Sequence, residues 1–321
     1  MKLPPSDHFN GRTFFNPGSR SQRGLRDVLR WKLTSRPARW PREVPLQPVV
    51  IPPAPTGGGL VVTWIGHSTF LIRACGAAWL TDPVFSNRIG PFRGLGPRRV
   101  VPPAIPLAAL PPIDGVLLSH DHYDHCDLPS LRALAAANEG LAVVSPLNYR
   151  ALLKAAGADR NLVELDWWQS CEGPGQTAVE LVPARHWCRR SPWGTNVRLW
   201  GGFFVRGAGR ALYFAGDSGH DPALMAQIAD RCGAPDIALL PIGAYEPRWF
   251  MSDAHMNPAE AVACHRALRA RRSVGMHWGT FQLTDEGYHE PVEELAIARD
   301  AAGIAPGDFV ALLPGESLVI D

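Results

Sequence analysis

The chain has 321 residues, of which 46% are hydrophobic and 19% are charged, and its formal net charge is +2. This composition excludes a disordered chain, a coiled coil and a collagen-like fibre, and the length allows one large domain or two small ones. The 31 glycines and 31 prolines predict many turns between short elements.

The small net charge conceals a basic N-terminal arm. Residues 1–50 contain ten Lys and Arg against three acids, a net charge of +7, which leaves −5 for residues 51–321. Within the arm, Leu25, Val28, Leu29 and Leu33 recur at helical spacing between basic residues. Such a stripe either packs on its own domain, the commoner outcome, or lies on an anionic membrane surface. The negative remainder, with no added nucleic-acid domain, disfavours a nuclease.

The cysteines and the N-terminal residues predict a location in the cell. The first residues lack the apolar stretch of a secretory signal, and no run of about 18 apolar residues predicts a transmembrane helix. None of the six cysteines forms a CxxC pair. We therefore expect a cytoplasmic protein with reduced thiols, with peripheral membrane contact through the arm as the alternative.

Beyond the arm, short strands precede and then alternate with helices. Residues 44–58 are rich in Pro and Gly and predict a linker, and residues 83–112, with eight prolines, predict a long loop. The predicted strands are 60–65, 69–73, 79–81, 115–119, 141–145, 178–183, 200–205, 211–215, 237–241, 273–276 and 309–313. The predicted helices are 128–138, 148–156, 222–231, 258–270 and 291–302. This order favours a layered α/β protein.

The strongest chemical signal is the sequence HDHYDH at residues 120–125, directly after the predicted strand 115–119. Neutral imidazole nitrogens and carboxylate oxygens are ligands of zinc and similar divalent ions. His186, Asp217 and His277 also follow predicted strands. Because α/β sheets place their ligand sites at the carboxyl ends of strands, we expect all these residues to meet at one metal site.

Longer blocks of sequence carry a resemblance to a known family. They are WIGHSTFLI (64–72), TDPVFS (81–86), SHDHYDHCD (119–127), ARHWCRR (184–190), YFAGDSG (213–219), PIGAYEPRWFM (241–251), HMNPAEA (255–261) and MHWGTFQL (276–283). With these blocks the chain resembles the metallo-β-lactamase-fold superfamily of dinuclear hydrolases, and within it the N-acylphosphatidylethanolamine-hydrolysing phospholipases D. The resemblance implies an αββα sandwich of four layers over residues 59–321. Residues 1–58 would be a basic arm and Pro-rich linker packed on that domain.

The resemblance also implies the metal ligands and the reaction. Two zinc ions would be bound, one by three histidines, the other by one aspartate and two histidines, with a further aspartate bridging both. The three histidines of the first ion would be His120, His122 and His186. The second ion would be bound by Asp124, His125 and His277, and the bridging aspartate would be Asp217. A metal-bridging hydroxide would attack the phosphorus of a phospholipid such as N-acylphosphatidylethanolamine, giving N-acylethanolamine and phosphatidic acid. Asp124 would also orient the hydroxide, so that Asp124 and Asp217 count as catalytic residues.

Further residues near these motifs are candidates for substrate contact. Tyr245, Arg248 and Trp249 follow the strand 237–241, and we expect their loop to overhang the site and bind substrate. Arg248 would either bind a phosphate group of the substrate or form an ion pair with Glu246, and we expect the ion pair. His255 matches a family position near the site, and we expect it to be a third catalytic residue that contacts the substrate or the leaving group.

Some roles stay open. Asp82 and His67 either orient metal ligands or satisfy backbone groups in the N-terminal hairpin. The same fold also hosts hydrolases of lactones, thioesters and soluble phosphodiesters, so one of these is the alternative activity. A non-catalytic lipid- or metal-binding module is the alternative from another class; a missing ligand would favour it, and none is missing. The sequence carries no signal for an oligomeric state.

Overall fold

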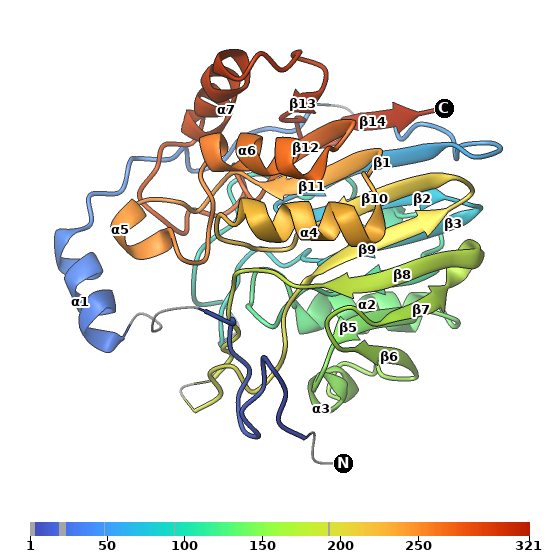
Figure 1. Ribbon diagram of the computed structural model, residues 1–321, viewed down its shortest axis with the longest axis horizontal. Coiled ribbons are helices and arrows are strands. Elements are labelled where there is room, and N and C mark those ends of the chain that lie inside the picture. Colours follow the sequence, from blue (N-terminus) through green and yellow to red (C-terminus); the bar gives the residue numbers. More distant parts are fainter. Residues whose placement is uncertain (1–3, 19–23, 48, 93, 192) are drawn as a thin grey trace.

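The computed structural model describes residues 4–18, 24–47, 49–92, 94–191 and 193–321. Three basic residues of the arm, Lys2, Arg20 and Arg23, lie outside these ranges. Two seven-stranded sheets lie face to face, and helices cover their outer faces (Figure 1). The predicted αββα sandwich is therefore confirmed.

The first sheet holds the N-terminal strands and closes with the C-terminal one. Its order is β14-β1-β2-β3-β4-β5-β6, with β1 to β3 antiparallel to one another and β3 to β6 parallel. Its strands are β1 (Leu60–Gly66), β2 (Thr69–Ala74), β3 (Ala77–Thr81), β4 (Gly115–Leu117), β5 (Ala142–Pro146), β6 (Asn161–Leu165) and β14 (Ser317–Ile320).

The second sheet has the order β13-β12-β11-β10-β9-β8-β7. Because β9 is antiparallel to both β8 and β10, and β10 to β13 are parallel, β8, β10, β11 and β12 all end at the same edge. Its strands are β7 (Ser170–Gly173), β8 (Thr177–Val182), β9 (Gly202–Gly207), β10 (Arg210–Phe214), β11 (Ile237–Pro241), β12 (Arg272–Met276) and β13 (Phe309–Val310).

The strands are apolar on both faces because each sheet lies between another sheet and a layer of helices or loops. In β2, Phe70 and Ile72 face the second sheet, whereas Leu71 faces the outer cluster that packs on α2 and α3. This alternation follows from the two-residue period of a strand. The β2 sequence TFLIRA thus reads as one continuous apolar run up to Arg73.

Seven α-helices are described, and several begin at strong sequence signals. Asn257 and Glu260 form a capping box at the start of α6, and Pro258 occupies its first turn. The helix α6 packs against α4, α7 and β11, which covers the second sheet. The helices are α1 (Leu25–Thr34), α2 (Leu128–Ala137), α3 (Arg150–Lys154), α4 (Pro222–Cys232), α5 (Arg248–Met251), α6 (Pro258–Leu268) and α7 (Glu290–Ala301).

The N-terminal arm has two parts with different environments. In the first part, Phe9 and Phe14 are buried and join the main apolar core, and the Phe14 amide donates to the Asn196 carbonyl. In the second part, the helix α1 leaves Leu29 and Leu33 exposed to solvent. The expectation that the apolar stripe packs on the domain is wrong for these two side chains.

The structure adds elements that the sequence did not indicate, namely β6, β7, β14 and the short helix α5. The predicted long loop at 83–112 is present, with one 3-10 turn at Leu107–Ala109. All six cysteines are unpaired thiols. Within the described ranges, no helix combines the length and the apolar character needed to span a bilayer.

Candidate metal centre

The candidate metal ligands follow four strands that end at the same side of the molecule. The segment 120–125 follows β4 of the first sheet, and the other ligands follow β8, β10 and β12 of the second sheet. The backbone turns after His122, whose carbonyl accepts from the amides of His125 and Cys126. This turn lets one short segment supply ligands to two neighbouring positions.

Three histidines form the first group, which we call the three-histidine cluster. His122 Nδ1 lies 3.0 Å from His120 Nε2 and 3.2 Å from His186 Nε2. Ligands placed tetrahedrally around one ion, with bonds of about 2.0–2.1 Å, lie about 3.3–3.4 Å apart. The spacing of these three nitrogens therefore fits a single zinc-like ion.

A carboxylate and two histidines form the second group, the Asp–His cluster. Asp124 Oδ2 lies 3.5 Å from His125 Nε2 and 3.4 Å from His277 Nε2, and the two imidazole nitrogens are 3.2 Å apart. These separations again match ligands on one ion. The mixed carboxylate and imidazole set suits zinc and related borderline metals.

Asp217 lies between the two clusters. Its Oδ2 is 3.2 Å from His125 Nε2 and 3.1 Å from His277 Nε2, and it is 3.9 and 3.8 Å from the Nε2 atoms of His120 and His186. Its Oδ1 is buried without a hydrogen-bond partner in the described chain. A buried carboxylate oxygen with no partner is costly, and a metal ion would satisfy it. The seven residues thus fit two ions with Asp217 between them.

The histidines and carboxylates of the centre shift one another's pKa values because they are buried close together. Burial opposes ionisation of Asp217, but His125 and His277 outweigh it and hold the Asp217 pKa well below its usual range. Burial likewise opposes protonation of His277, but Asp217 and Asp124 raise its pKa to about 9. Burial lowers the His122 pKa to about 3. A metal bound here would replace protons held by the Asp–His cluster.

Asp82 and His67 both contact side chains of the Asp–His cluster. Asp82 Oδ2 lies 2.6 Å from His125 Nδ1, and Asp82 also accepts hydrogen bonds from the Ser119 amide and hydroxyl. His67 Nε2 lies 3.0 Å from Asp124 Oδ2. A carboxylate behind a ligating histidine fixes its tautomer and makes it a more basic ligand.

The three-histidine cluster is held by neutral groups instead. The Ser119 hydroxyl, which donates to Asp82, lies 2.9 Å from His120 Nδ1. His186 Nδ1 lies 3.0 Å from the Ala254 carbonyl. The Asn16 side chain donates to the His186 carbonyl at 2.8 Å. Sequence reasoning missed Asn16 and Ser119, although Ser119 is the first residue of the quoted block 119–127.

His255 lies beside both clusters. Its Nδ1 is buried without a hydrogen-bond partner in the described chain and lies 3.8 Å from Asp217 Oδ2, and its ring contacts those of His186 and His277. Burial lowers its pKa well below the usual range, so the imidazole is neutral at pH 7. The structure therefore brings His255 to the site together with the seven candidate ligands.

The other three candidates for substrate contact are turned toward neighbouring elements. The Tyr245 hydroxyl donates to Glu290 in α7. Arg248 binds the Glu260 carboxylate at 2.6 Å and donates to the carbonyls of Tyr245 and His255. The expected ion pair between Arg248 and Glu246 is wrong, because the Glu246 carboxylate accepts the Arg248 backbone amide and the guanidinium reaches Glu260. Trp249 is partly exposed, and the guanidinium of Arg30 in α1 lies over its ring.

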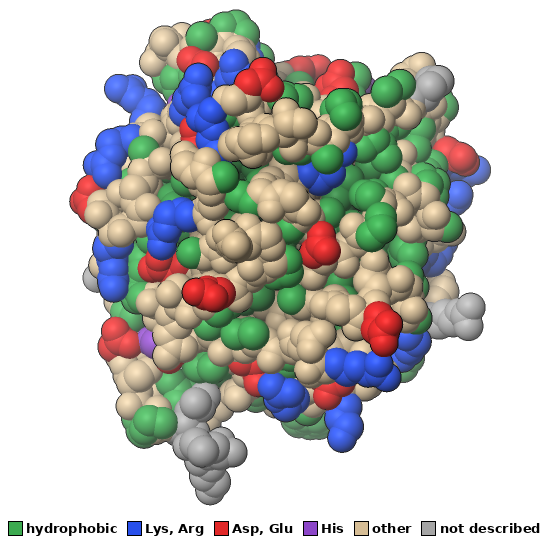
Figure 2. All heavy atoms as spheres, turned by 90° about the vertical axis from the view of Figure 1, so that its right-hand side faces the viewer, with side chains coloured by type: hydrophobic (Ala, Val, Ile, Leu, Met, Phe, Trp, Pro, Cys, Tyr) green, Lys and Arg blue, Asp and Glu red, His purple; other side chains and the backbone are tan. Residues whose placement is uncertain are grey.

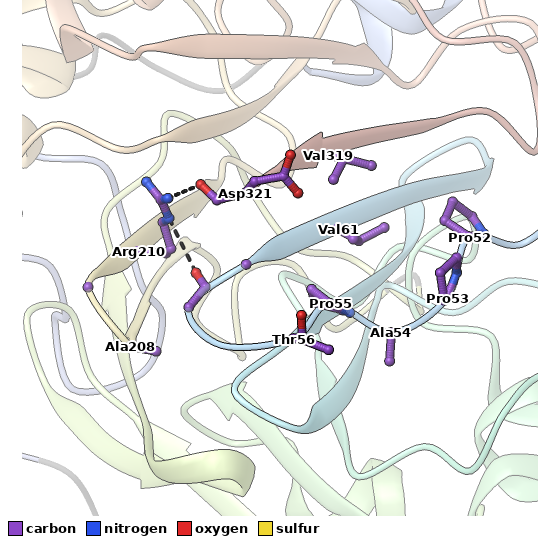
Figure 3. Close-up of a pocket in the computed structure, with 13 residues that line it drawn as sticks. Pro52, Pro53, Ala54, Pro55, Thr56, Val61, Ala208, Arg210, Val319 and Asp321 are labelled. Atoms are coloured by element: carbon purple, nitrogen blue, oxygen red, sulfur yellow. Dashed lines mark hydrogen bonds between the residues drawn. The ribbon is translucent and has the colours of Figure 1, made fainter.

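A separate surface pocket lies at the opposite end of the sheets, between the linker 52–59 and β14 (Figure 3). Its lining contains no histidine or cysteine, and Arg210 donates to the Gly58 and Asp321 carbonyls. That end of the molecule has Lys, Arg, Asp and Glu scattered over it and hardly any visible histidine (Figure 2). The candidate metal ligands instead follow the carboxyl ends of β4, β8, β10 and β12.

Comparisons with known proteins agree with this geometry. The family described as "Beta-lactamase superfamily domain" matches residues 78–278. The N-acyl-phosphatidylethanolamine-hydrolyzing phospholipase D 1 of Caenorhabditis elegans is 36% identical over 328 residues, covering 96% of this chain and 92% of that protein. The mitochondrial phospholipase D of the same description from Saccharomyces cerevisiae is 35% identical, covering 75% of this chain and 52% of that protein.

A solved structure supports the fold. Igni18, a metallo hydrolase from Ignicoccus hospitalis, superposes with a TM-score of 0.60 at 22% identity, over 82% of this chain and 99% of that one. The chain therefore belongs to the β-lactamase superfamily of metal-dependent hydrolases. Within that superfamily it is similar to relatives named as phospholipases D that hydrolyse N-acylphosphatidylethanolamine.

Proposed function

We propose that this protein is a zinc-dependent phosphodiesterase of phospholipase D type. It would hydrolyse phospholipids such as N-acylphosphatidylethanolamine to N-acylethanolamine and phosphatidic acid. The observation that carries the proposal is Asp217 Oδ2, which lies 3.1–3.9 Å from four imidazole nitrogens of two separate clusters. The 36% identity with the nematode phospholipase D, over nearly the whole chain, supports the choice of substrate.

The two clusters would hold the metal, and other residues would arrange the reactants. If zinc is bound by these seven residues, it would supply a hydroxide nucleophile at neutral pH and would offset charge on the phosphoryl oxygens. Asp124, fixed by His67 at 3.0 Å, presents a carboxylate that can accept a hydrogen bond from the attacking water. In the overall reaction the water oxygen bonds to phosphorus, the bond from phosphorus to the N-acylethanolamine oxygen breaks, and that oxygen takes up a proton.

His255 is our candidate for contact with the substrate. Because its imidazole is neutral and its Nδ1 has no partner in the described chain, Nδ1 is free to form one hydrogen bond with the phosphate or the leaving oxygen. Substrate contact by Tyr245, Arg248 and Trp249 stays a prediction. The hydrogen bond from Arg248 to the His255 carbonyl supports an indirect role, in which Arg248 positions His255.

The lipid substrate and the basic arm together favour peripheral contact with a membrane, and we place the enzyme in the cytoplasm on that surface. The arm, residues 1–58, would be an appendage of one hydrolase domain, residues 59–321. The burial of Phe9 and Phe14 supports an arm whose first part is packed on the domain.

A substrate panel tests the proposed activity. The purified, zinc-loaded protein is assayed on N-acylated and plain phosphatidylethanolamine, bis-p-nitrophenyl phosphate and a lactone, alongside metal analysis. We expect turnover of the N-acylated phospholipid and the phosphodiester with bound zinc. Lactone turnover without phosphodiester turnover would replace our proposal with another hydrolase of the superfamily, and metal binding without turnover would favour a non-catalytic module.

A further inference from the structure

The helix α1 carries an apolar face that nothing in the described chain covers. Leu29 and Leu33, one turn apart, are 62% and 85% exposed. On a helix with 3.6 residues per turn, Arg26 and Lys32 lie about 60° to either side of Leu29. The outer face of α1 is thus an apolar strip flanked by long cationic side chains, the pattern of helices that lie in a membrane interface.

The opposite face of α1 is anchored, which fixes the direction of the exposed strip. The Trp31 ring stacks on Phe250 of α5 at 4.8 Å between ring centroids, and the Arg30 guanidinium lies 4.6 Å from the Trp249 ring centroid. Ser35, just after the helix, donates to Asp285 at 2.6 Å. Because these contacts occupy the inner face, Leu29 and Leu33 must point away from the domain.

The charge around the strip is positive and uncompensated. Exposed basic side chains recur through residues 24–39, where Asp27 is the single acid, for a net charge of +4. Asp27 accepts the Gly24 amide at the start of the helix. In the described ranges none of the five cations Arg26, Arg30, Lys32, Arg36 and Arg39 forms an ion pair with a carboxylate. Arg30 lies over the Trp249 ring and Lys32 over the Trp31 ring, and these contacts leave their positive charges unneutralised. Unpaired cations beside apolar side chains complement an anionic lipid surface.

Two loops near the metal centre carry more exposed apolar side chains. Phe92 and Leu95 lie in one loop, and Trp193, which is 93% exposed, lies in the other. Tyr123, which follows His122, contacts both loops. It packs against the small apolar cluster that includes Ile89 of the first loop, and its hydroxyl donates to the Arg190 carbonyl of the second.

On the other side of the centre, α1 rests on α5, and both helices lie at the left of Figure 1. In α5, Arg248 donates to the carbonyl of His255, which lies beside both metal clusters. The helix α1 is therefore linked to His255 through α5, and the two loops are linked through Tyr123 to the segment that carries His122.

We propose that α1, together with Phe92, Leu95 and Trp193, docks the protein on an anionic phospholipid bilayer and holds the metal centre against it. Leu29 and Leu33 enter the acyl region, and the cations that flank them bind lipid phosphates. The inference rests on the proposed function, because it assumes that the substrate lies in that bilayer. A second copy of the chain fits this surface less well than a bilayer does. A two-fold interface would bring the cations of one copy close to the same cations of the other, and they would repel each other.

Vesicle binding by the full-length, zinc-loaded protein tests the docking surface. We expect it to sediment with vesicles of phosphatidylcholine and phosphatidylglycerol, but not with phosphatidylcholine alone, and to be released by salt. The double variant Leu29→Ser/Leu33→Ser should lower the partition at least about tenfold. Ile297→Ser is the matched control, because Ile297 is 71% exposed but lies on α7, and it should bind like the wild type.

Activity on two substrates separates docking from catalysis. The double variant should keep wild-type turnover of soluble bis-p-nitrophenyl phosphate and lose turnover of phospholipid in vesicles. Equal vesicle binding by the wild type and the double variant would overturn the docking surface, whatever the substrate. The docking surface would also be overturned if the wild type forms a dimer and does not bind vesicles, while the double variant is a monomer. The exposed strip would then be an interface with a second copy of the chain. Vesicle binding without any phospholipid turnover would refute the proposed function and leave the docking surface standing.

Discussion

The two clusters of the metal centre are supported differently by the residues behind them. The Asp–His cluster has a carboxylate ligand, and a second carboxylate, Asp82, lies 2.6 Å behind His125. The three-histidine cluster is backed by a hydroxyl group and by the Ala254 carbonyl. Because negative charge near a ligating histidine strengthens its bond to a cation, we expect the Asp–His cluster to bind its metal more tightly. The Asp–His cluster should then bind its metal first and release it last.

Removing the shared carboxylate should have the largest effect. Asp217→Ala takes a ligand from both clusters at once and leaves several buried imidazoles close together. We expect loss of both ions and a fall in kcat of at least about 10²–10³-fold. Metal analysis and turnover of bis-p-nitrophenyl phosphate check this, and full occupancy with full activity would refute the bridging role.

Removing the charge behind His125 should affect one cluster more than the other. Asp82→Asn keeps the shape of the side chain but removes its charge, so we expect the Asp–His cluster to lose about 10–100-fold in metal affinity. The three-histidine cluster, which Asp82 reaches through the Ser119 hydroxyl beside His120, should lose less affinity, and this difference is what the experiment measures. Competition with a chelator measures both constants, and equal weakening of the two clusters would show that Asp82 supports the centre as a whole.

Asn16 should have a smaller effect on the other cluster. Asn16→Ala removes the hydrogen bond to the His186 carbonyl, so we expect a few-fold loss of affinity in the three-histidine cluster alone. Asn10→Ala is the matched control, because the Asn10 side chain binds only within its own turn of the arm. If both variants weaken the metal site equally, the arm acts through its general folding and not through Asn16.

The smallest effect should be a pH dependence of the arm. Burial lowers the pKa of His8, but the hydrogen bonds to Asp166 and Asp7 outweigh it, so the pKa is raised above 6.5. Protonated His8 therefore stabilises the docked arm below about pH 6.5, and this stabilisation is lost as the pH rises through the raised pKa. Amide exchange of residues 8–16 should quicken from pH 6.5 upwards beyond the intrinsic rate. In the variant His8→Gln, amide exchange of these residues should follow the intrinsic pH dependence alone. If the additional pH dependence persists in this variant, it arises from a group other than His8.

The residues of the candidate metal centre could be predicted because each segment that carries them follows a strand. His120 follows β4, Asp217 follows β10, and His277 follows β12, so the strand directions alone bring them to one edge. Apolar runs and helix caps are local signals, and they predicted a layered α/β protein; the αββα sandwich was implied by the family resemblance.

The contacts of the loop after β11 could not be predicted in this way. Arg248 pairs with Glu260 and not with the nearer Glu246, because the chain between them turns back through α5 to the start of α6. The Tyr245 hydroxyl meets Glu290 for a similar reason, since α7 packs there only in the folded chain. Strand β14 pairs with β1 across almost the whole length of the sequence, and no local pattern indicates that pairing.

The most direct test of a dinuclear phospholipase D combines metal analysis with isotope transfer. The zinc-reconstituted protein is incubated with N-acylphosphatidylethanolamine in water enriched in oxygen-18, and both products are examined by mass spectrometry. We expect two zinc ions per chain, label in the phosphatidic acid and none in the N-acylethanolamine, because the water oxygen bonds to phosphorus. Label in the N-acylethanolamine, or hydrolysis at an acyl ester in place of the phosphodiester, would contradict the proposed function.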